Sequence, residues 1–278
     1  MKKTLQNRVL VVTGASAGIG RAAALEAALR GARVVLSARR EEKLREAARE
    51  IESAGGRALV HVADVSSREE MEALAARARE TFGRVDAFLA NAGYGFLRPA
   101  ADLPEEDHRR LFEVNYWGTV HCVKAVVPLF RAQGRGHLLI TSSFVAKIGL
   151  PYYGPYSATK AAQDALATAL RLELEPEGIH VSSIYPIGTA TEFHQVSARI
   201  TGRPGAFRNT PSLFVQSARH VGRRIARCLE RPVPEVWPSG LSRFLAALGV
   251  LSPRLTRFLL KAHAKKCARI WKDRGKEG

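Results

Sequence analysis

Residues 9–20 read VLVVTGASAGIG, an apolar run that leads into a loop of small residues. The run predicts a strand, and the alanine-rich residues 18–30 predict the helix that follows it. Glycines at this junction let the backbone turn tightly and approach a pyrophosphate, whose charge the amino terminus of a helix favours. The loop therefore predicts a nucleotide site rather than a simple turn, although its spacing is G-x-x-x-G-x-G and not G-x-G-x-x-G. The expected cofactor contacts in this loop are Gly14, Ser16, Gly18, Ile19 and Gly20.

Apolar runs and helical stretches alternate along the rest of the chain. Strands that are apolar throughout are buried on both faces, which indicates a parallel sheet covered by helices, and the alternation predicts an α/β, doubly wound fold. Residues 187–214 have no clear period, so we expect a lid or a substrate loop there. The further strands are expected at 33–37, 58–62, 86–90, 137–142, 179–185 and 234–238, and the further helices at 41–54, 68–82, 105–132, 156–175 and 215–230.

The composition is that of an ordinary globular protein. The chain has 278 residues, of which 46% are hydrophobic and 25% charged, which suits one large α/β domain or two small ones. Cys122, Cys228 and Cys267 show neither metal-ligand spacing nor a disulfide framework, so we expect a reducing, cytoplasmic compartment. No apolar leader precedes the first strand, and no run approaches the ~18 apolar residues of a spanning helix. We therefore expect neither a signal peptide nor a membrane span.

The net charge of +17 is concentrated at one end of the chain. Residues 1–198 hold 25 basic and 22 acidic residues, whereas residues 199–278 hold 18 and 4. We expect a nucleotide-binding domain at 1–240 and a basic, amphipathic helical extension at 241–278. The extension carries two apolar stripes, separated by a proline at position 253: Leu241, Phe244, Leu245 and Leu248, then Leu255, Phe258, Leu259 and Ala262.

Three interpretations of this extension stay open. Packing on the core or on another subunit is the first. Peripheral contact with an anionic membrane, with the apolar stripes inward and the cations outward, is the second. Nucleic-acid binding is the third, and we do not favour it because no recognition motif is present.

Arginines, not acids, follow the second strand. A carboxylate at this point would bind the ribose 2′-hydroxyl of NAD, whereas arginine suits the 2′-phosphate of NADP. Positions 36–40 contain no Asp or Glu but do contain Arg39 and Arg40. We therefore expect a preference for NADP(H), with NAD(H) as the alternative cofactor. Pairing of the arginines with Glu41 or Glu42 is the competing interpretation of this segment.

Polar and small residues follow the third and fourth strands. Asp64, with Val65 next to it, stands where a carboxylate can accept a hydrogen bond from the adenine amino group. Asn91, Ala92 and Gly93 follow the fourth strand, at the carboxyl edge of the sheet where ligands collect. We expect all five residues to contact the cofactor.

A tyrosine and a lysine four positions apart share one face of the helix expected at 156–175. A phenol with a pKa of about 10 is a poor acid-base group near neutrality, but an adjacent ammonium favours the phenolate and lowers that pKa. Tyr156 and Lys160 are therefore a candidate proton-transfer pair, and Ser143 lies thirteen positions before the tyrosine. Taken alone, the pair is equally well explained as a surface lysine near a tyrosine.

Together these residues resemble the short-chain dehydrogenases/reductases. The resemblance spans about residues 8–192 and rests on the glycine loop, Asp64, the Asn91–Gly93 segment, Asn115, Ser143 and the Tyr156/Lys160 pair. It implies a single Rossmann-type domain with a seven-stranded parallel sheet, a nicotinamide cofactor, and a homodimer or homotetramer. Two departures are that the family's Pro-Gly is replaced by Pro186-Ile187-Gly188, and that Ser143 is followed by Phe144.

The resemblance also implies a role for each site residue. Tyr156 would donate a proton to the carbonyl oxygen during reduction, and Lys160 would lower its pKa and hold the nicotinamide ribose. Ser143, in preference to the adjacent Ser142, would position the substrate oxygen. Asn115 would hold a water that links Lys160 to solvent, and a helix–helix hydrogen bond is the alternative interpretation of this residue. Pro186 and Thr191 would contact the cofactor near the nicotinamide.

Aromatic and aliphatic side chains near these segments are candidate walls for a substrate. We expect an apolar carbonyl or alcohol as the substrate, although any one of these residues is equally well explained as core. The predicted function is that of an NADP(H)-dependent oxidoreductase that interconverts a carbonyl and an alcohol. The alternative is a non-catalytic dinucleotide sensor or scaffold, which could dispense with Ser143, Tyr156 and Lys160. The candidate wall residues are Tyr94, Phe96, Leu97, Phe144, Leu150, Tyr152, Tyr153, Phe193 and Phe207.

Overall fold

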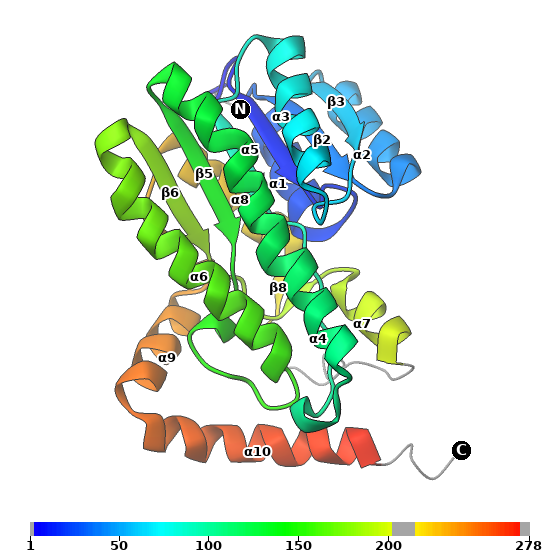
Figure 1. Ribbon diagram of the computed structural model, residues 1–278, viewed down its shortest axis with the longest axis vertical. Coiled ribbons are helices and arrows are strands. Elements are labelled where there is room, and N and C mark those ends of the chain that lie inside the picture. Colours follow the sequence, from blue (N-terminus) through cyan, green and yellow to red (C-terminus); the bar gives the residue numbers. More distant parts are fainter. Residues whose placement is uncertain (1–2, 202–214, 273–278) are drawn as a thin grey trace.

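A seven-stranded, fully parallel sheet forms the centre of the protein (Figure 1). The structure is a computed structural model that describes residues 3–201 and 215–272. The strand order is β3-β2-β1-β4-β5-β6-β9, so the chain starts in the middle of the sheet and winds outward in both directions. The predicted α/β fold and strand number are confirmed. The strands are β1 (Val9–Thr13), β2 (Arg33–Ala38), β3 (Arg57–Val62), β4 (Ala87–Ala90), β5 (Gly136–Thr141), β6 (Ile179–Ile184) and β9 (Glu235–Val236).

Helices cover both faces of this sheet and create two cores. Residues of α1 (Gly18–Ala28), α2 (Glu41–Ser53) and α8 (Ala218–Glu230) form the first core with one face of the sheet. Residues of α3 (Arg68–Phe82), α5 (Gly118–Gln133) and α6 (Gly154–Leu174) form the second with the other face. Each apolar strand therefore serves two layers, as its sequence predicts.

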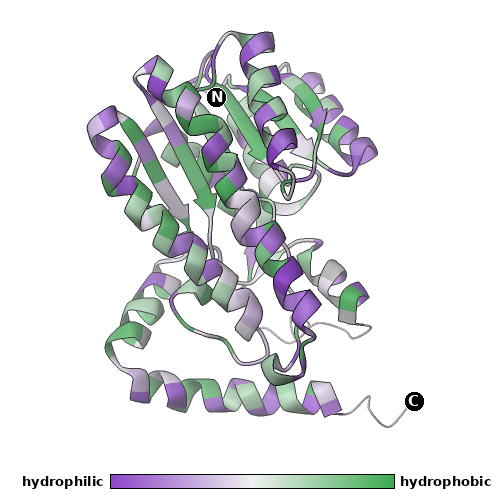
Figure 2. Ribbon diagram, viewed as in Figure 1, coloured by the Kyte–Doolittle hydropathy of each residue, from purple (hydrophilic) through white to green (hydrophobic). Residues whose placement is uncertain are grey.

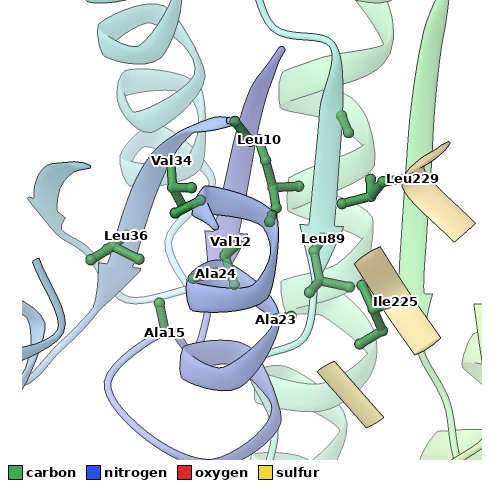
Figure 3. Close-up of a cluster of buried hydrophobic side chains, with 14 of the residues drawn as sticks. Leu10, Val12, Ala15, Ala23, Ala24, Val34, Leu36, Leu89, Ile225 and Leu229 are labelled. Atoms are coloured by element: carbon green, nitrogen blue, oxygen red, sulfur yellow. The ribbon is translucent and has the colours of Figure 1, made fainter. Parts of the chain in front are cut away.

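The alternation along β1 shows how one strand supplies both cores. Leu10 and Val12 belong to the first core, where Figure 3 shows them among side chains of β2, β4, α1 and α8. Val9 and Val11 belong to the second core. All four are 2% exposed or less, and each such side chain contributes roughly 1.5–3 kcal/mol through burial. A polar residue at any of the four positions would therefore cost the fold more than a surface change would.

The long helix expected at 105–132 is interrupted by a wider turn. α4 (Glu105–Phe112) continues through a π-helical turn (Glu113–Trp117) into α5. Single π-helical turns inserted between α-helices are rare and are frequent at functional sites. This turn contains Asn115, which is fully buried.

The segment after β6 is more regular than its sequence predicts. β7 (Thr189–Ala190) pairs in parallel with β8 (Gln216–Ser217), and α7 (Phe193–Thr201) lies between them along the chain. The candidate wall residue Phe207 lies outside the described residues. A short helix and a two-stranded ribbon thus replace part of the irregular loop expected at 187–214.

Two helices follow the sheet, α9 (Gly240–Leu251) and α10 (Pro253–Lys272). The break between them falls at the predicted proline, since a proline suits the first turn of a helix and disfavours helical geometry in the residue before it. α10 crosses the end of the molecule towards which the strands point (Figure 1). Within the described ranges, no helix is long and apolar enough to cross a bilayer.

Candidate active site

The glycine loop after β1 is packed against the segment that follows β4. Gly14 has a left-handed backbone with φ of 65°, and a Cβ on it would lie 2.9 Å from the Cα of Ala92. A Cβ on Gly20 would lie 2.5 Å from the carbonyl oxygen of Gly14. A Cβ on Gly18, also left-handed, would lie 3.1 Å from the side chain of Thr191. The structure therefore brings Gly14, Gly18, Gly20 and the predicted Ala92 and Thr191 into one place.

Asn91 ties the ends of three strands together. Its Nδ2 donates to the carbonyl of Thr13 at 3.0 Å, and its Oδ1 accepts from Oγ1 of Thr141 at 3.2 Å. Its backbone N–H donates to Oγ1 of Thr13 at 3.0 Å. The side chain of Asn91 is thus hydrogen-bonded to both β1 and β5. It holds the glycine loop in place and is not a free polar group.

The amino terminus of α1 fits an anionic ligand. Its N-cap is Ala17, which supplies no capping side chain, and its first turn contains no acidic residue. The free N–H groups of a first turn favour a phosphate or another anion. Arg40 reaches the same loop, because its Nη2 lies 3.1 Å from Oγ of Ser16 and 2.8 Å from Oε2 of Glu192. The first turn of α1, which includes Ile19, fits a dinucleotide pyrophosphate.

Arg39 lies over the carboxylate that follows β3. Its Nη1 is 3.4 Å from Oδ2 of Asp64, and Oδ1 of Asp64 accepts hydrogen bonds from the N–H and hydroxyl of Ser66. Burial alone would raise the pKa of Asp64, but the Ser66 hydrogen bonds and the Arg39 charge outweigh it and hold that pKa below its usual value. The carbonyl of Val65 lies 3.0 Å from Nδ1 of His121. Neither Arg39 nor Arg40 forms the pair with Glu41 or Glu42 that the sequence left open.

Tyr156 stands in the first turn of α6 within an aromatic cluster. Its ring centroid lies 5.4 Å from that of Phe193 and 6.4 Å from that of Tyr153. Burial raises the pKa of Tyr156, and a hydrogen bond with Ser143 opposes that rise. Ser142 points elsewhere, since its hydroxyl donates to the carbonyl of Lys160 at 3.2 Å. Of the two adjacent serines, the structure therefore brings Ser143 to the tyrosine.

Lys160 is 3% exposed, and burial lowers its pKa to about 7. Its Nζ donates to the carbonyl of Thr141 at 2.8 Å and lies 5.7 Å from the centroid of the Tyr156 ring. We expected the ammonium to lower the pKa of the phenol. The structure differs, because desolvation penalises the charged form of both groups and so raises one pKa while it lowers the other.

Asn115 is held by the backbone next to Gly93. Its Oδ1 accepts from the N–H of Tyr94 at 2.9 Å, and its Nδ2 donates to the carbonyl of Tyr94 and to Oγ1 of Thr159. A Cβ on Gly93 would lie 2.9 Å from that Oδ1 and 3.5 Å from Nζ of Lys160. The backbone at Gly93 therefore passes close to both the amide of Asn115 and Nζ of Lys160, and the position has no room for a side chain.

Part of the expected apolar wall gathers around Tyr156. Leu97 and Tyr153 pack there with the partly buried Leu150, Tyr152 and Tyr156. Tyr94 and Phe96 form a separate cluster, and Phe144 packs against residues that follow β6 and β9. Pro186 accepts a hydrogen bond from the N–H of Phe144 at 3.0 Å, which fixes the start of the loop after β6.

Three residues of this site were not predicted from the sequence. A Cβ on Gly95 would lie 2.5 Å from Cδ2 of Tyr156, so only glycine permits the observed contact. Cys267, which is fully buried, and Ile270 reach the cluster of Leu97 and Tyr153 from α10. For Gly95 the sequence did hold a signal, namely a second glycine two residues after Gly93. For Cys267 and Ile270, no local pattern indicates where α10 packs.

The described cavities lie away from this site. One, of about 470 Å³, is at the amino-terminal edge of the sheet and includes Arg8, Asp86 and His137 in its lining. The other, of about 740 Å³, lies between α3 and α5. Neither cavity is lined by Tyr156 or Lys160, so the candidate active site is identified from its side chains and not from a large cavity.

Comparison with known proteins agrees with this geometry. The profile of the family described as short chain dehydrogenase matches residues 8–199. The uncharacterized oxidoreductase YxnA of Bacillus subtilis is 32% identical over 263 residues, covering 93% of this chain and 73% of that protein, so the similarity extends into α10.

Two solved structures share the fold over most of their length. A short chain dehydrogenase/reductase from Burkholderia phymatum in complex with NAD superposes with a TM-score of 0.81 at 25% identity, covering 91% of this chain and 96% of that one. An alcohol dehydrogenase from the archaeon Thermococcus sibiricus complexed with 5-hydroxy-NADP has a TM-score of 0.72 at 31% identity, with 82% and 94% covered.

Proposed function

This chain belongs to the short chain dehydrogenase family, and we propose that it is an NADP(H)-dependent oxidoreductase that interconverts a carbonyl and an alcohol on an apolar small molecule. One observation carries the proposal: Tyr156, Ser143 and Lys160 lie together, and the Ala92–Gly93 segment is close both to Lys160 and to the glycine loop that leads into the uncapped α1. A proton donor, an orienting hydroxyl and an anion-binding helix end are the parts that a hydride-transfer enzyme needs from its protein.

The bound nicotinamide would supply the hydride, and the protein would supply the proton. In our proposal the hydroxyl of Tyr156 donates its proton to the substrate oxygen, while Ser143 donates a second hydrogen bond that orients this oxygen. A phenol is protonated at neutral pH at its ordinary pKa of about 10, and burial raises the pKa of Tyr156 further, so the residue holds the proton that it would give. A positioned general acid contributes roughly 10²–10⁴-fold to the rate.

Lys160 would return the proton that Tyr156 gives away. With a pKa near 7, its Nζ gains and loses a proton readily around neutrality, while its bond to Thr141 keeps it in position. Gly93 lies close to both Nζ and the amide of Asn115, and this nearness supports the proposal that a water bound by these groups connects the lysine to solvent. The amide of Asn115 would then orient this water as well as the backbone of Tyr94.

The preference for NADP(H) rests on the end of β2. The side chains of Arg39 and Arg40 are 70% and 50% exposed, so both can turn to a 2′-phosphate, and Arg40 already contacts the glycine loop through Ser16. We expect Arg40→Ala to weaken NADPH binding about tenfold or more and NADH binding little, because a charge-assisted hydrogen bond contributes ~1.5–3 kcal/mol. Titration of the native chain and of Arg40→Ala with both cofactors measures this. Equal losses for NADPH and NADH would contradict the assignment.

The Tyr156→Phe variant tests the proposed chemistry. We expect its kcat/KM for carbonyl reduction with NADPH to fall at least ~100-fold while NADPH binding is kept, because only the donated proton is lost. Tyr116→Phe is the matched control, since it removes a phenol hydroxyl from the neighbouring π-helical turn. A dinucleotide sensor, the alternative function, would bind NADPH and reduce no member of a carbonyl panel. Full activity in Tyr156→Phe would refute the mechanism.

Assembly and location complete the proposal. We propose a homodimer or homotetramer, by analogy with the family, and a reducing cytoplasmic environment. The second point is supported by Cys122, Cys228 and Cys267, which are all free and buried. We also propose peripheral contact with an anionic membrane through residues 241–278. Sedimentation velocity, redox treatment and vesicle binding would test the three points separately.

A further inference from the structure

We infer that α9 and α10 place the active site against an anionic lipid bilayer, and that the substrate is an apolar carbonyl compound that enters from the lipid beside α10. The inference rests on the proposed function for its substrate and on the surface of α9 and α10 for its location. We call the exposed side of these two helices the docking surface; it comprises Leu241, Phe244, Val250, Leu251, Phe258, Leu259, Lys261, Lys265 and Arg269.

Exposed apolar side chains are concentrated on the docking surface. Eleven large hydrophobic residues are exposed in the described part of the chain, and six of them lie in α9 and α10. Phe244, Leu251 and Phe258 are 63%, 82% and 72% exposed. Single exposed hydrophobic residues are ordinary, but a group of them on one surface indicates a binding partner. Figure 2 shows apolar and polar residues alternating along α10, whereas α9 is mostly apolar.

The charge of this surface selects the partner. Residues 237–272 contain eight Lys and Arg and no Asp or Glu. Some exposed arginines elsewhere have carboxylate partners, such as Arg45 with Glu41 and Arg131 with Glu177. Among the described residues, Lys261, Lys265 and Arg269 form no ion pair. Apolar side chains flanked by unpaired cations suit the interface of an anionic bilayer.

A second copy of the chain fits this surface less well. In a twofold interface the same patch meets itself, so these cations would face one another with no carboxylate from 237–272 to offset them. A polyanion such as nucleic acid would pair with the cations but would leave Phe244, Leu251 and Phe258 in water. The bilayer satisfies both kinds of side chain at once.

α10 has a second side, which belongs to the active site. Cys267 is fully buried and, with Ile270, packs against Leu97 and Tyr153 in the cluster that includes Tyr156. Positions 261, 265 and 269 lie on the opposite side of the same helix, because each residue advances the helix by about 100°. One helix, roughly 10–12 Å across, would therefore separate the bilayer from the wall of the site.

This arrangement indicates the class of substrate. The wall that α10 completes is apolar, and the helix that carries it would lie on lipid, so a long-chain aldehyde or ketone could pass from bilayer to site without crossing water. Displacing α10 from Leu97 would open that route. A short, water-soluble carbonyl would not need it, which makes the two substrates a direct comparison.

The inference has a docking half, that α9 and α10 bind an anionic bilayer, and a substrate half, that the substrate enters from the lipid. The docking half is tested by sedimentation of the full chain with phosphatidylcholine vesicles that contain or lack phosphatidylglycerol, at low and high salt. We expect binding only with the anionic lipid, and about 100-fold weaker binding in K261Q/K265Q/R269Q, since each cation contributes about fivefold at an anionic surface. R49Q/R57Q/R79Q is the matched control, with the same charge change on α2, β3 and α3 at the other end of the molecule.

Three results would overturn the docking half. They are no sedimentation of the native chain at low salt, equal losses in the two triple variants, and dissociation of an oligomer by F244S/F258S with no change in vesicle binding. The last would make this face an interface between copies of the chain.

The substrate half is tested with a long-chain methyl ketone in the same vesicles and a short water-soluble ketone. In K261Q/K265Q/R269Q we expect kcat/KM to fall at least tenfold for the long ketone and to stay unchanged for the short one. Unchanged turnover of the long ketone by a variant that no longer binds vesicles would overturn entry from the lipid. No NADPH-dependent turnover of either ketone by the native chain would overturn the proposed function and the substrate half, and sedimentation would still decide the docking half.

Discussion

Replacing Lys160 with methionine should change how the stability of the cofactor-free protein depends on pH. The lysine is buried, and its pKa in the fold is about 7 against an ordinary value of 10.5. Between these two values the unfolded chain binds the proton and the folded chain does not. The folded state therefore gains stability as the pH rises through this window.

The size of the effect follows from the two pKa values. Between pH 7 and pH 9, this one group should add about 2 kcal/mol to the free energy of unfolding. Lys160→Met removes that rise. The variant also leaves the carbonyl of Thr141 without its donor, at a cost of about 1–3 kcal/mol. That cost is the same at every pH. The titration of Lys160 is therefore seen in how the free energy of unfolding changes with pH, and not in its value at one pH.

Urea denaturation at pH 7, 8 and 9 measures this slope. The native chain and Lys160→Met should differ by about 2 kcal/mol in their change from pH 7 to pH 9. Lys124→Met, at an exposed position of α5, controls for the loss of a lysine from the unfolded chain. If native and variant chains show the same slope, Lys160 does not titrate near neutrality, and its proposed part in returning the proton to Tyr156 is wrong.

Three further substitutions test the site and the core. Gly20→Ala places a Cβ 2.5 Å from a loop carbonyl oxygen and should weaken NADPH binding about tenfold or more, measured by titration, whereas Gly240→Ala meets no atom within 4 Å and should not. Gly95→Ala places a Cβ 2.5 Å from the ring of Tyr156 and should lower kcat about 100-fold with NADPH binding kept; an unchanged kcat would show that the ring can move freely. Burial lowers the pKa of His137 to about 3, so the native chain should lose stability as the pH falls from 7 to 5. In denaturation curves, His137→Gln should lose about 2 kcal/mol less of its free energy of unfolding over that interval. Equal losses in the two chains would rule out this histidine as the cause.

The sheet and the glycine loop after β1 could be predicted because their signals are local. Residues 9–12 of β1 are all apolar because both faces of the strand are buried, and Gly14 and Gly20 after it are required by contacts of less than 3 Å. Gly14 and Gly20 therefore reveal a packing constraint within a few residues of sequence. The Tyr156 and Lys160 pair shares this property, since helical spacing alone brings the two side chains together.

The features that escaped prediction depend on contacts between distant segments. Nothing near Arg40 indicates that it meets Glu192, which is 152 positions away. The opposite pKa shifts of Tyr156 and Lys160 arise from burial, which a sequence motif does not measure. Cys267 belongs to a helix whose sequence shows an apolar stripe but not the surface that the stripe covers.

The packing of α10 has a consequence for the order in which the protein folds. The contacts of Cys267 with Leu97 and Tyr153 join segments more than 100 positions apart, farther than any two neighbouring strands, so the loop that they close costs more entropy, by about 0.6 kcal/mol for each doubling of its length. The sheet strands pair with much nearer partners and can form first. The site should therefore be completed late in folding, and α10 should open at a lower free energy than the sheet beneath it. Hydrogen exchange would show this as weaker protection of amides in α10 than in β1 or β4.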